Sequence, residues 1–526
     1  MTRLSKTLAS LSVLALALAG CTAESPSPPD SSGASGASDS GGDGAVVTVA
    51  GGPVRGTVRP DHRVFKAIPY AAAPVGDLRW QPPEPAPPWS GTRDGTRAGA
   101  QCPQSGTVLP GFVSPLPQSE DCLSVNVWAP PAGDDARRPV LVWIHGGGNV
   151  GGNGDLYDAQ RLVTRGDLVV VTLNYRLGAL GWLADPVLAA GGKAGNYGTL
   201  DQQAALRWVR DNIAAFGGDP ARVTVGGESA GGSAVCNQMA APGSDSLFRA
   251  GILQSAPCST QLSTTAERSE AYTAAVGCTD PATAAACLRE LPVSTLQKTA
   301  GAPNGPVAGG PGLPVAPPQA LAHGAGGKRP VLVGGNTDEG TFFTALEPPT
   351  TAGEYPGRLA GAHPAIADRV EQAYPLSEYG GDPHLALSAV TTDAMLACPT
   401  ERTIDSLRGT GSAVYQYEFA DTTAPAPRDM PEVSFPLGAS HTFELRYLFD
   451  IKGFGPLTAA QQRLADQMVG YWARFVHTGD PATPRQPAWP ARQTDTPTRL
   501  ALRADGPRAV SEPDRDHHCD LWSAPQ

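Results

Sequence analysis

The chain has 526 residues, of which 41% are hydrophobic and 17% are charged, and its formal net charge at pH 7 is −11. This length suggests either about three domains or one unusually large α/β domain with a sizeable core. The acidic balance argues against a nucleic-acid-binding protein, which would need a basic face.

The first twenty residues have the pattern of a secretory signal. Arg3 and Lys6 precede an apolar run at residues 8–19, which is too short to span a bilayer comfortably. The run ends in Leu-Ala-Gly-Cys21, which resembles a bacterial lipobox. We therefore expect cleavage before Cys21 and its lipidation with two or three acyl chains, which would anchor an extracytoplasmic protein to the membrane. The alternative is an ordinary secretory signal followed by a chance cysteine.

Residues 22–44 consist almost entirely of Ser, Pro, Gly, Ala, Asp and Thr, a composition typical of a flexible tether. We expect one large folded domain to occupy residues 45–526. The chain has nine cysteines, and removing Cys21 leaves eight, enough for four disulfides in an oxidising compartment.

The remaining chain alternates expected strands and helices. Strands are expected at 46–49 and 54–58 as a hairpin around two glycines, and at 123–128, 139–144, 168–173, 222–225, 250–254, 330–333 and 414–419. Helices are expected at 200–216, from 230 onward and at 459–477. The apolar runs at 139–144 and 168–173 indicate parallel strands buried on both faces. The pattern predicts an α/β fold, a large and mostly parallel twisted sheet flanked by helices.

Residues 227–231 read Gly-Glu-Ser-Ala-Gly, the G-x-S-x-G pattern of a nucleophile elbow between a strand and a helix. Glycines are needed there because side chains at Gly227 and Gly231 would collide with neighbouring segments. The turn would expose the hydroxyl of Ser229 above the sheet, and the following helix would direct its positive dipole at developing negative charge.

Gly146, Gly147 and Gly148 follow a buried strand and could direct backbone N–H groups at one point, as an oxyanion hole requires. The same region also satisfies the G-x-G-x-x-G dinucleotide fingerprint. That alternative needs a helix directly after the loop and an acidic residue at the end of the next strand. The sequence instead continues with three glycines in residues 151–155, and the next strand ends in Asn-Tyr-Arg. No cofactor is expected.

A serine nucleophile needs a base, and a base needs an orienting group. His441 lies after the expected strand at 414–419, which suits the chain order nucleophile, acid, histidine. Asp338 and Glu339 both follow the strand at 330–333, and their spacing alone does not choose between them.

Five segments in order resemble the type-B carboxylesterases, the family of cholinesterases and bacterial para-nitrobenzyl esterases. They are residues 67–83, the Glu-Asp-Cys-Leu motif at 120–127, Phe-Gly-Gly-Asp-Pro at 216–220 leading to the elbow, Asn-Thr-Asp-Glu-Gly at 336–340, and Gly-Ala-Ser-His at 438–441. The resemblance covers nearly all of residues 45–526. It implies an α/β-hydrolase fold and a serine carboxylic ester hydrolase that acts through an acyl-enzyme on small-molecule esters.

The resemblance also implies the role of each residue. Ser229 would be the nucleophile, His441 the base and Glu339 its orienter. Gly147, Gly148 and Ala230 would supply the oxyanion N–H groups. Glu228 would support the site without being the triad acid.

The family's disulfide pattern implies three pairings here, and the two remaining cysteines are expected to pair with each other. The pairs are Cys102 with Cys122, Cys278 with Cys287, Cys398 with Cys519, and Cys236 with Cys258. Residues 516–519, Asp-His-His-Cys, could suggest a metal cluster, but with Cys519 in a disulfide no metal site is expected.

Two departures from the family pattern bear on the substrate. Asn149 stands where the family usually has an aromatic residue, and Phe112 stands where cholinesterases have a tryptophan that holds a quaternary ammonium. Because phenylalanine binds cations less well than tryptophan, a general esterase is favoured over a choline esterase. The alternative function is a non-catalytic binding or adhesion protein on the same fold, although this sequence has every triad residue.

Overall fold

The computed structural model describes residues 46–104, 110–111, 113–133, 136–189, 193–258, 264–484, 486–493, 497–511 and 517–523. These residues belong to one compact unit, Asp43–Gln526. The expected signal at residues 1–20, the lipidated Cys21 and the tether at 21–44 therefore lie outside the described residues.

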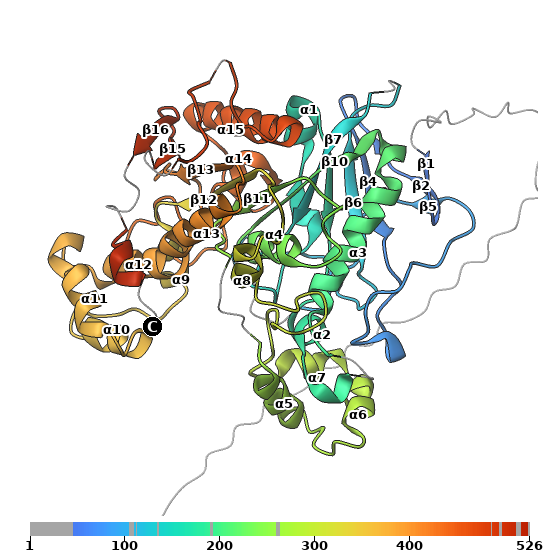
Figure 1. Cartoon of the computed structure of the whole chain (residues 1–526), viewed down its shortest axis with the longest axis horizontal. Helices are drawn as coiled ribbons and strands as arrows, with labels where there is room; N and C mark the ends of the chain where they lie inside the picture. The colour runs from blue at the N-terminus through green and yellow to red at the C-terminus, as the bar shows by residue number, and fades with distance from the viewer. Residues whose placement is uncertain are drawn as a thin grey trace, which may run out of the picture. The chain divides into compact units, whose positions relative to one another are not determined.

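The central feature is an eleven-stranded sheet with the order β16-β15-β13-β12-β11-β10-β7-β9-β6-β4-β3 (Figure 1). Its seven neighbouring strands from β15 to β9 pair in parallel, and the outer strands pair antiparallel. This confirms the predicted mostly parallel α/β sheet. The strands are β3 (Thr57–Val58), β4 (Arg63–Pro69), β6 (Ser124–Ala129), β7 (Arg138–Ile144), β9 (Val169–Leu173), β10 (Gly218–Glu228), β11 (Ala250–Gln254), β12 (Val331–Asn336), β13 (Val414–Phe419), β15 (Thr498–Leu502) and β16 (Arg508–Ser511).

The expected N-terminal hairpin forms from β1 (Val46–Val49) and β2 (Gly52–Arg55). Its second strand is shorter than the sequence suggested, because residues 54–58 are divided between two sheets. The division falls at Gly56, where a Cβ atom would come within 2.6 Å of the carbonyl oxygen of Val64. After this close approach the chain continues as β3 and pairs with β4 in the large sheet.

Alternate residues of β7 enter separate apolar clusters on the two faces of the sheet. Val140, Val142 and Ile144 belong to one cluster, and Leu141 and Trp143 belong to the other. All five side chains are at most 1% exposed. The continuous apolar run in the sequence is therefore explained by burial on both faces.

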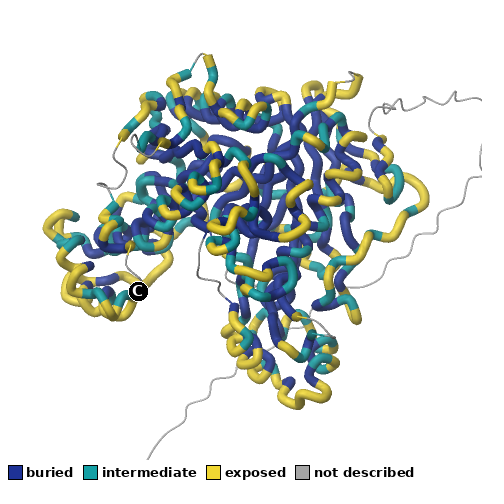
Figure 2. Tube along the Cα trace, in the orientation of Figure 1, coloured by how far each residue is buried: buried dark blue, intermediate teal, exposed yellow. Residues whose placement is uncertain are grey.

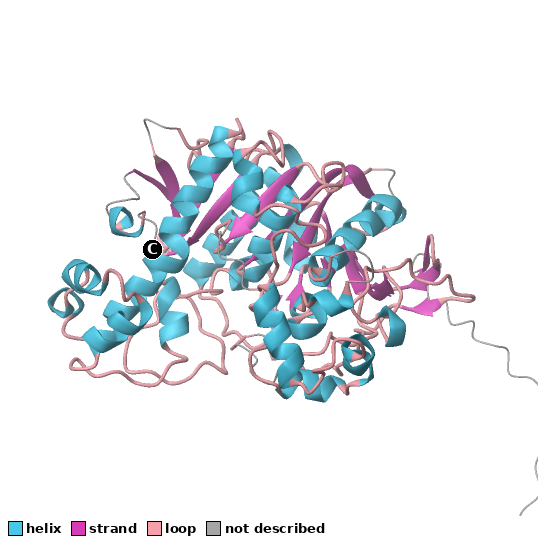
Figure 3. Ribbon diagram, turned by 60° about the horizontal axis from the view of Figure 1, so that its bottom comes forward, coloured by secondary structure: helices cyan, strands magenta, loops and turns pink. Residues whose placement is uncertain are grey.

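Helices cover both faces of the sheet (Figure 3). The first cluster contains residues from α3 (Tyr197–Asn212), α4 (Ala230–Ala240) and α13 (Cys398–Gly409), and the second contains residues from α1 (Gln160–Gly166) and α15 (Ala459–Thr478). Figure 2 shows buried residues along the strands, whereas exposed residues dominate outlying helices such as α10 (Tyr355–Ala362) and α11 (Ala367–Ala373).

Strand β10 is longer than predicted at both ends: it begins at Gly218, and it runs through the glycines after Val225 to Glu228. It is flanked by β7 and β11, and Gly226 pairs with Trp143 on one side and Ile252 on the other. Hydrogen bonds from both neighbours offset the weak strand preference of glycine.

The parallel strands end at one edge of the sheet, where ligands bind in open α/β folds. The glycine loop follows β7, Ser229 follows β10, and Glu339 begins helix α9 (Glu339–Thr344) after β12. In the described part of the chain, no helix combines the length and apolar character needed to cross a membrane.

Candidate active site

Ser229 occupies a sharp turn between β10 and α4. Its backbone angles are φ 55° and ψ −127°, a strained conformation for a residue with a side chain. A Cβ atom at Gly231 would lie 2.1 Å from the carbonyl oxygen of Ile144, and one at Gly227 would lie 2.4 Å from the carbonyl carbon of Gly231. The predicted steric need for glycine at both positions is confirmed.

The glycine loop lies directly against the elbow. A Cβ atom at Gly146 would come within 3.2 Å of the Cβ of Ser229. Gly147 has φ +102°, and a Cβ atom there would lie 2.3 Å from the carbonyl oxygen of Gly151. The loop can therefore adopt its path only with glycine at this position.

Three N–H groups beside Ser229 are available to a ligand. Within the described residues, the amides of Gly147, Gly148 and Ala230 donate no hydrogen bond. Ala230 is the first residue of α4, so its N–H has no partner inside the helix. Free backbone donors next to a nucleophile are what an oxyanion hole consists of.

His441 and Glu339 form a buried pair. Nδ1 of His441 lies 2.5 Å from Oε2 of Glu339, and both side chains are at most 3% exposed. The other carboxylate oxygen of Glu339 accepts a hydrogen bond from the amide of Asn336 at 2.8 Å. Glu339 is thus fixed at the end of β12 and directed at the imidazole.

Asp338, the other candidate acid, has a different position. Its carboxylate accepts a hydrogen bond from the amide of Ala439 at 2.8 Å, and its own amide donates to the carbonyl oxygen of the same residue at 3.0 Å. Asp338 therefore fastens the loop that carries His441, whereas Glu339 contacts the histidine ring itself.

Aromatic rings pack beside the histidine. The ring centroids of Phe342 and Phe343 lie 5.7 and 5.0 Å from that of His441. Both residues belong to α9, the helix that begins with Glu339. One short helix therefore supplies both the carboxylate and the apolar wall that hold the imidazole.

Glu228 contacts His441 directly, which the sequence did not indicate. Oε1 of Glu228 lies 3.2 Å from Nε2 of His441. Glu228 is fully buried, and neither of its carboxylate oxygens has a hydrogen-bond partner among the described residues. The hydroxyl of Ser229 likewise makes no hydrogen bond within this part of the chain.

Burial and charge change the pKa values of these groups. Burial raises the pKa of Glu228 well above its ordinary value. Burial lowers the pKa of His441, but the carboxylates of Glu228 and Glu339 more than offset this effect, and its net pKa rises to about 9. The site therefore stabilises an imidazolium, the form a general base takes when it has accepted a proton.

A third buried carboxylate, Glu444, supports the acid loop, although no role was predicted for it. Its two oxygens accept hydrogen bonds from Nδ2 of Asn336 at 2.7 Å and from Nε2 of Gln254 at 3.0 Å. The indole of Trp472 donates to Gln254 at 2.8 Å. Burial raises the pKa of Glu444 to about 7. Its only signal in the sequence is a glutamate close after His441.

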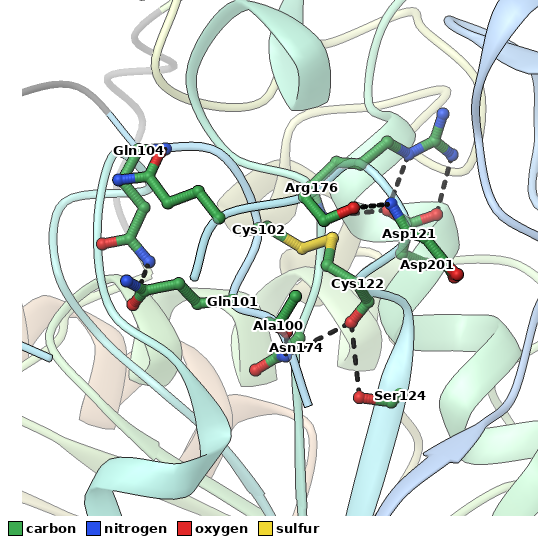
Figure 4. Close-up of a disulfide and its surroundings, with 12 residues drawn as sticks. Ala100, Gln101, Cys102, Gln104, Asp121, Cys122, Ser124, Asn174, Arg176 and Asp201 are labelled. Atoms are coloured by element: carbon green, nitrogen blue, oxygen red, sulfur yellow. Dashed lines mark hydrogen bonds and ion pairs between the residues drawn. A yellow bond between two sulfur atoms is a disulfide. The ribbon is translucent and has the colours of Figure 1, made fainter. Parts of the chain in front are cut away.

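Three disulfides of the described residues pair as the resemblance implied, and the two remaining cysteines pair with each other as expected. The disulfides join Cys102 to Cys122, Cys236 to Cys258, Cys278 to Cys287 and Cys398 to Cys519. Figure 4 shows the Cys102–Cys122 disulfide beside the buried ion pair of Arg176 and Asp201.

Three further positions were singled out in the sequence: the Asp-His-His-Cys segment, Asn149 and Phe112. In that segment, Nδ1 of His517 lies 2.8 Å from Oδ1 of Asp393. The described residues contain no group of side chains suited to hold a metal ion. Asn149 follows the glycine loop with φ +59°. Phe112 lies outside the described residues.

Comparison with known proteins gives consistent matches. The model of the Carboxylesterase family matches residues 43–522. Fumonisin B1 esterase from Sphingopyxis macrogoltabida is 38% identical over 84% of this chain and 83% of its own length. Para-nitrobenzyl esterase from Bacillus subtilis is 34% identical over 88% and 95%, and cocaine esterase from Oryctolagus cuniculus is 35% identical over 84% and 88%.

Proposed function

The chain belongs to the carboxylesterase family and is an ester-hydrolysing enzyme, and we propose that it acts through a covalent acyl-enzyme on Ser229. The observation that carries this proposal is the 2.5 Å contact of Glu339 with Nδ1 of His441 beside the strained elbow of Ser229. With Nδ1 held in this way, Nε2 is the nitrogen that exchanges protons with the nucleophile and the leaving group.

In the proposed reaction, Oγ of Ser229 attacks the ester carbonyl carbon while Nε2 of His441 takes the hydroxyl proton. The carbonyl oxygen becomes an oxyanion, and the N–H groups of Gly147, Gly148 and Ala230 stabilise it. The C–O bond to the alcohol then breaks, and His441 returns the proton to the leaving alkoxide. A water molecule repeats these steps to release the acid.

The substrate class is small-molecule carboxylic esters. The relatives are named for different esters, fumonisin B1, para-nitrobenzyl esters and cocaine, so no single ester is assigned. Asn149 beside the glycine loop makes this part of the site more polar than an aromatic residue would, which is consistent with a general esterase.

The test uses p-nitrophenyl esters of increasing acyl length and a fluorophosphonate probe. Wild-type protein is expected to hydrolyse the esters and to become labelled, whereas Ser229→Ala should do neither. Ser233→Ala, one turn further along α4, is the matched control and should behave as wild type. Hydrolysis or labelling that persists in folded Ser229→Ala would refute the proposal, and unlabelled wild type would favour a non-catalytic binding protein.

We also propose that the protein is exported and anchored through lipid on Cys21. The lipobox-like sequence before Cys21 and the four disulfides in the described residues support an oxidising compartment. In the native host, Cys21→Ser should move esterase activity out of the membrane fraction. An unchanged membrane fraction in this variant would contradict the anchor.

A further inference from the structure

The loop closed by the Cys102–Cys122 disulfide contacts the segment that follows the glycine loop. The side chain of Gln104, 5% exposed, forms two hydrogen bonds with one residue, Gly152. Nε2 of Gln104 donates to the carbonyl oxygen of Gly152 at 2.7 Å, and Oε1 accepts from its amide at 3.1 Å. Figure 4 labels Gln104 beside Gln101 and the disulfide.

Gln104 is itself held by several contacts. Its backbone N–H donates to Oε1 of Gln118 at 3.0 Å, and its backbone carbonyl oxygen accepts from Nε2 of Gln297 at 2.7 Å. Its side-chain amide also donates to Oε1 of Gln101 at 3.1 Å. Because Cys102 lies only two residues earlier, the disulfide fixes the same segment of chain. These contacts fix the position of Gln104, so its side chain can in turn fix the position of Gly152.

The position of Gly152 is coupled to that of the glycine loop. The carbonyl oxygen of Gly147 accepts hydrogen bonds from the amides of Val150 and Gly151, each at 3.1 Å. A Cβ atom at Gly152 would lie 2.7 Å from the carbonyl oxygen of Gly146. With contacts this close, a movement of Gly152 is transmitted to Gly147, whose N–H is a proposed oxyanion donor.

We propose that Gln104 is a positioning residue for the oxyanion hole. Gln104 holds Gly152, and Gly152 holds the glycine loop where the N–H groups of that loop can donate hydrogen bonds to the oxyanion. Gln104 itself does not contact the substrate. This inference rests on the proposed function, because it assumes that Gly147 and Gly148 stabilise negative charge. A displacement of about 1 Å at such a site can cost about 100-fold in rate.

The test compares Gln104→Ala and Gln104→Met with wild type and with Gln461→Ala. Methionine keeps most of the volume of glutamine but cannot form either hydrogen bond to Gly152, so it remains informative if the alanine variant fails to fold. Gln461 is the matched control: it is buried, it donates to the carbonyl oxygen of Thr423 at 2.8 Å, and it lies at the start of α15.

We expect both Gln104 variants to lower kcat by about 10-fold or more, with KM changed by less than about 3-fold. The interaction that a displaced glycine loop weakens, between its N–H groups and the oxyanion, forms only in the transition state. Binding of a trifluoromethyl ketone, whose adduct with serine places an oxyanion in the same position, should weaken by the same factor as kcat/KM. Gln461→Ala should lower only the melting temperature.

An unchanged kcat in the Gln104 variants, or a loss that appears only in melting temperature as in Gln461→Ala, would overturn this inference. Ser229→Ala separates that result from failure of the proposed function. If it is inactive while the Gln104 variants retain wild-type kcat, only the role of Gln104 is refuted.

Discussion

Oε1 of Glu228 lies 3.2 Å from Nε2 of His441, the nitrogen that receives the proton of Ser229 in the proposed reaction. The imidazole is therefore placed between two carboxylates, with Glu339 at Nδ1. Glu228 is fully buried and its oxygens accept no hydrogen bonds from described residues, so burial favours its protonated form and raises its pKa. Both carboxylates raise the pKa of His441, and of the two it is Glu339 that accepts a hydrogen bond, from the amide of Asn336.

Glu228→Gln tests how much of the raised pKa of His441 comes from the charge of Glu228. Glutamine has the shape of a protonated glutamate and carries no charge. We expect the acidic limb of the pH profile of kcat/KM to move to lower pH, because the Glu228 carboxylate raises the pKa of His441, and kcat to fall by less than about 10-fold. An unmoved limb would contradict a charged Glu228 beside the imidazole.

Glu339→Gln is expected to have a much larger effect than Glu228→Gln. The Glu339 carboxylate helps to raise the pKa of His441, so its removal lowers that pKa and keeps the base neutral to lower pH. The acidic limb of kcat/KM should therefore move to lower pH, while kcat falls by about 1,000- to 10,000-fold as the imidazolium loses its partner. Equal effects of the two substitutions would contradict the assignment of Glu339 as the orienting acid.

The sequence predicted those parts of the fold whose signal is local. The apolar run of β7 and the pattern around Ser229 can each be read in a few consecutive residues, although the contacts that explain them come from the assembled sheet. The predicted end of β10 at Val225 was wrong, because pairing with β7 and β11 continues the strand to Glu228. Such pairing is a property of the assembled sheet and has no signal in the strand's own residues.

In the candidate site, too, contacts between distant segments could not be predicted from the sequence. Spacing alone could not choose between Asp338 and Glu339, because the choice depends on a loop about 100 residues later that brings Ala439 to one and His441 to the other. The contacts of Glu444 also needed the topology, since its partners come from different strands.

Gly231→Ala should damage the elbow, because the new Cβ would lie 2.1 Å from the carbonyl oxygen of Ile144 at the end of β7. We expect a loss of about 3 kcal/mol or more in the free energy of unfolding, with activity falling as the glycine loop is displaced. Gly357→Ala in α10 is the control, since nothing lies within 4 Å of its Cβ position. It should stabilise the protein by about 0.5–1 kcal/mol, measured by urea unfolding. Wild-type stability and activity in Gly231→Ala would show that the turn can relax.

Removing different disulfides should cost different amounts of stability. Cys398 and Cys519 are 121 residues apart, and Cys278 and Cys287 are 9 apart. If a disulfide acts mainly by restricting the unfolded chain, replacing the first pair with serines should cost about 5 kcal/mol, and replacing the second about 2–3 kcal/mol. Urea unfolding of both double variants, compared at equal slope, measures the difference. A reversed order would mean that packing in the folded state decides the cost, because Cys278 lies in a small apolar cluster with Leu288 and Leu296.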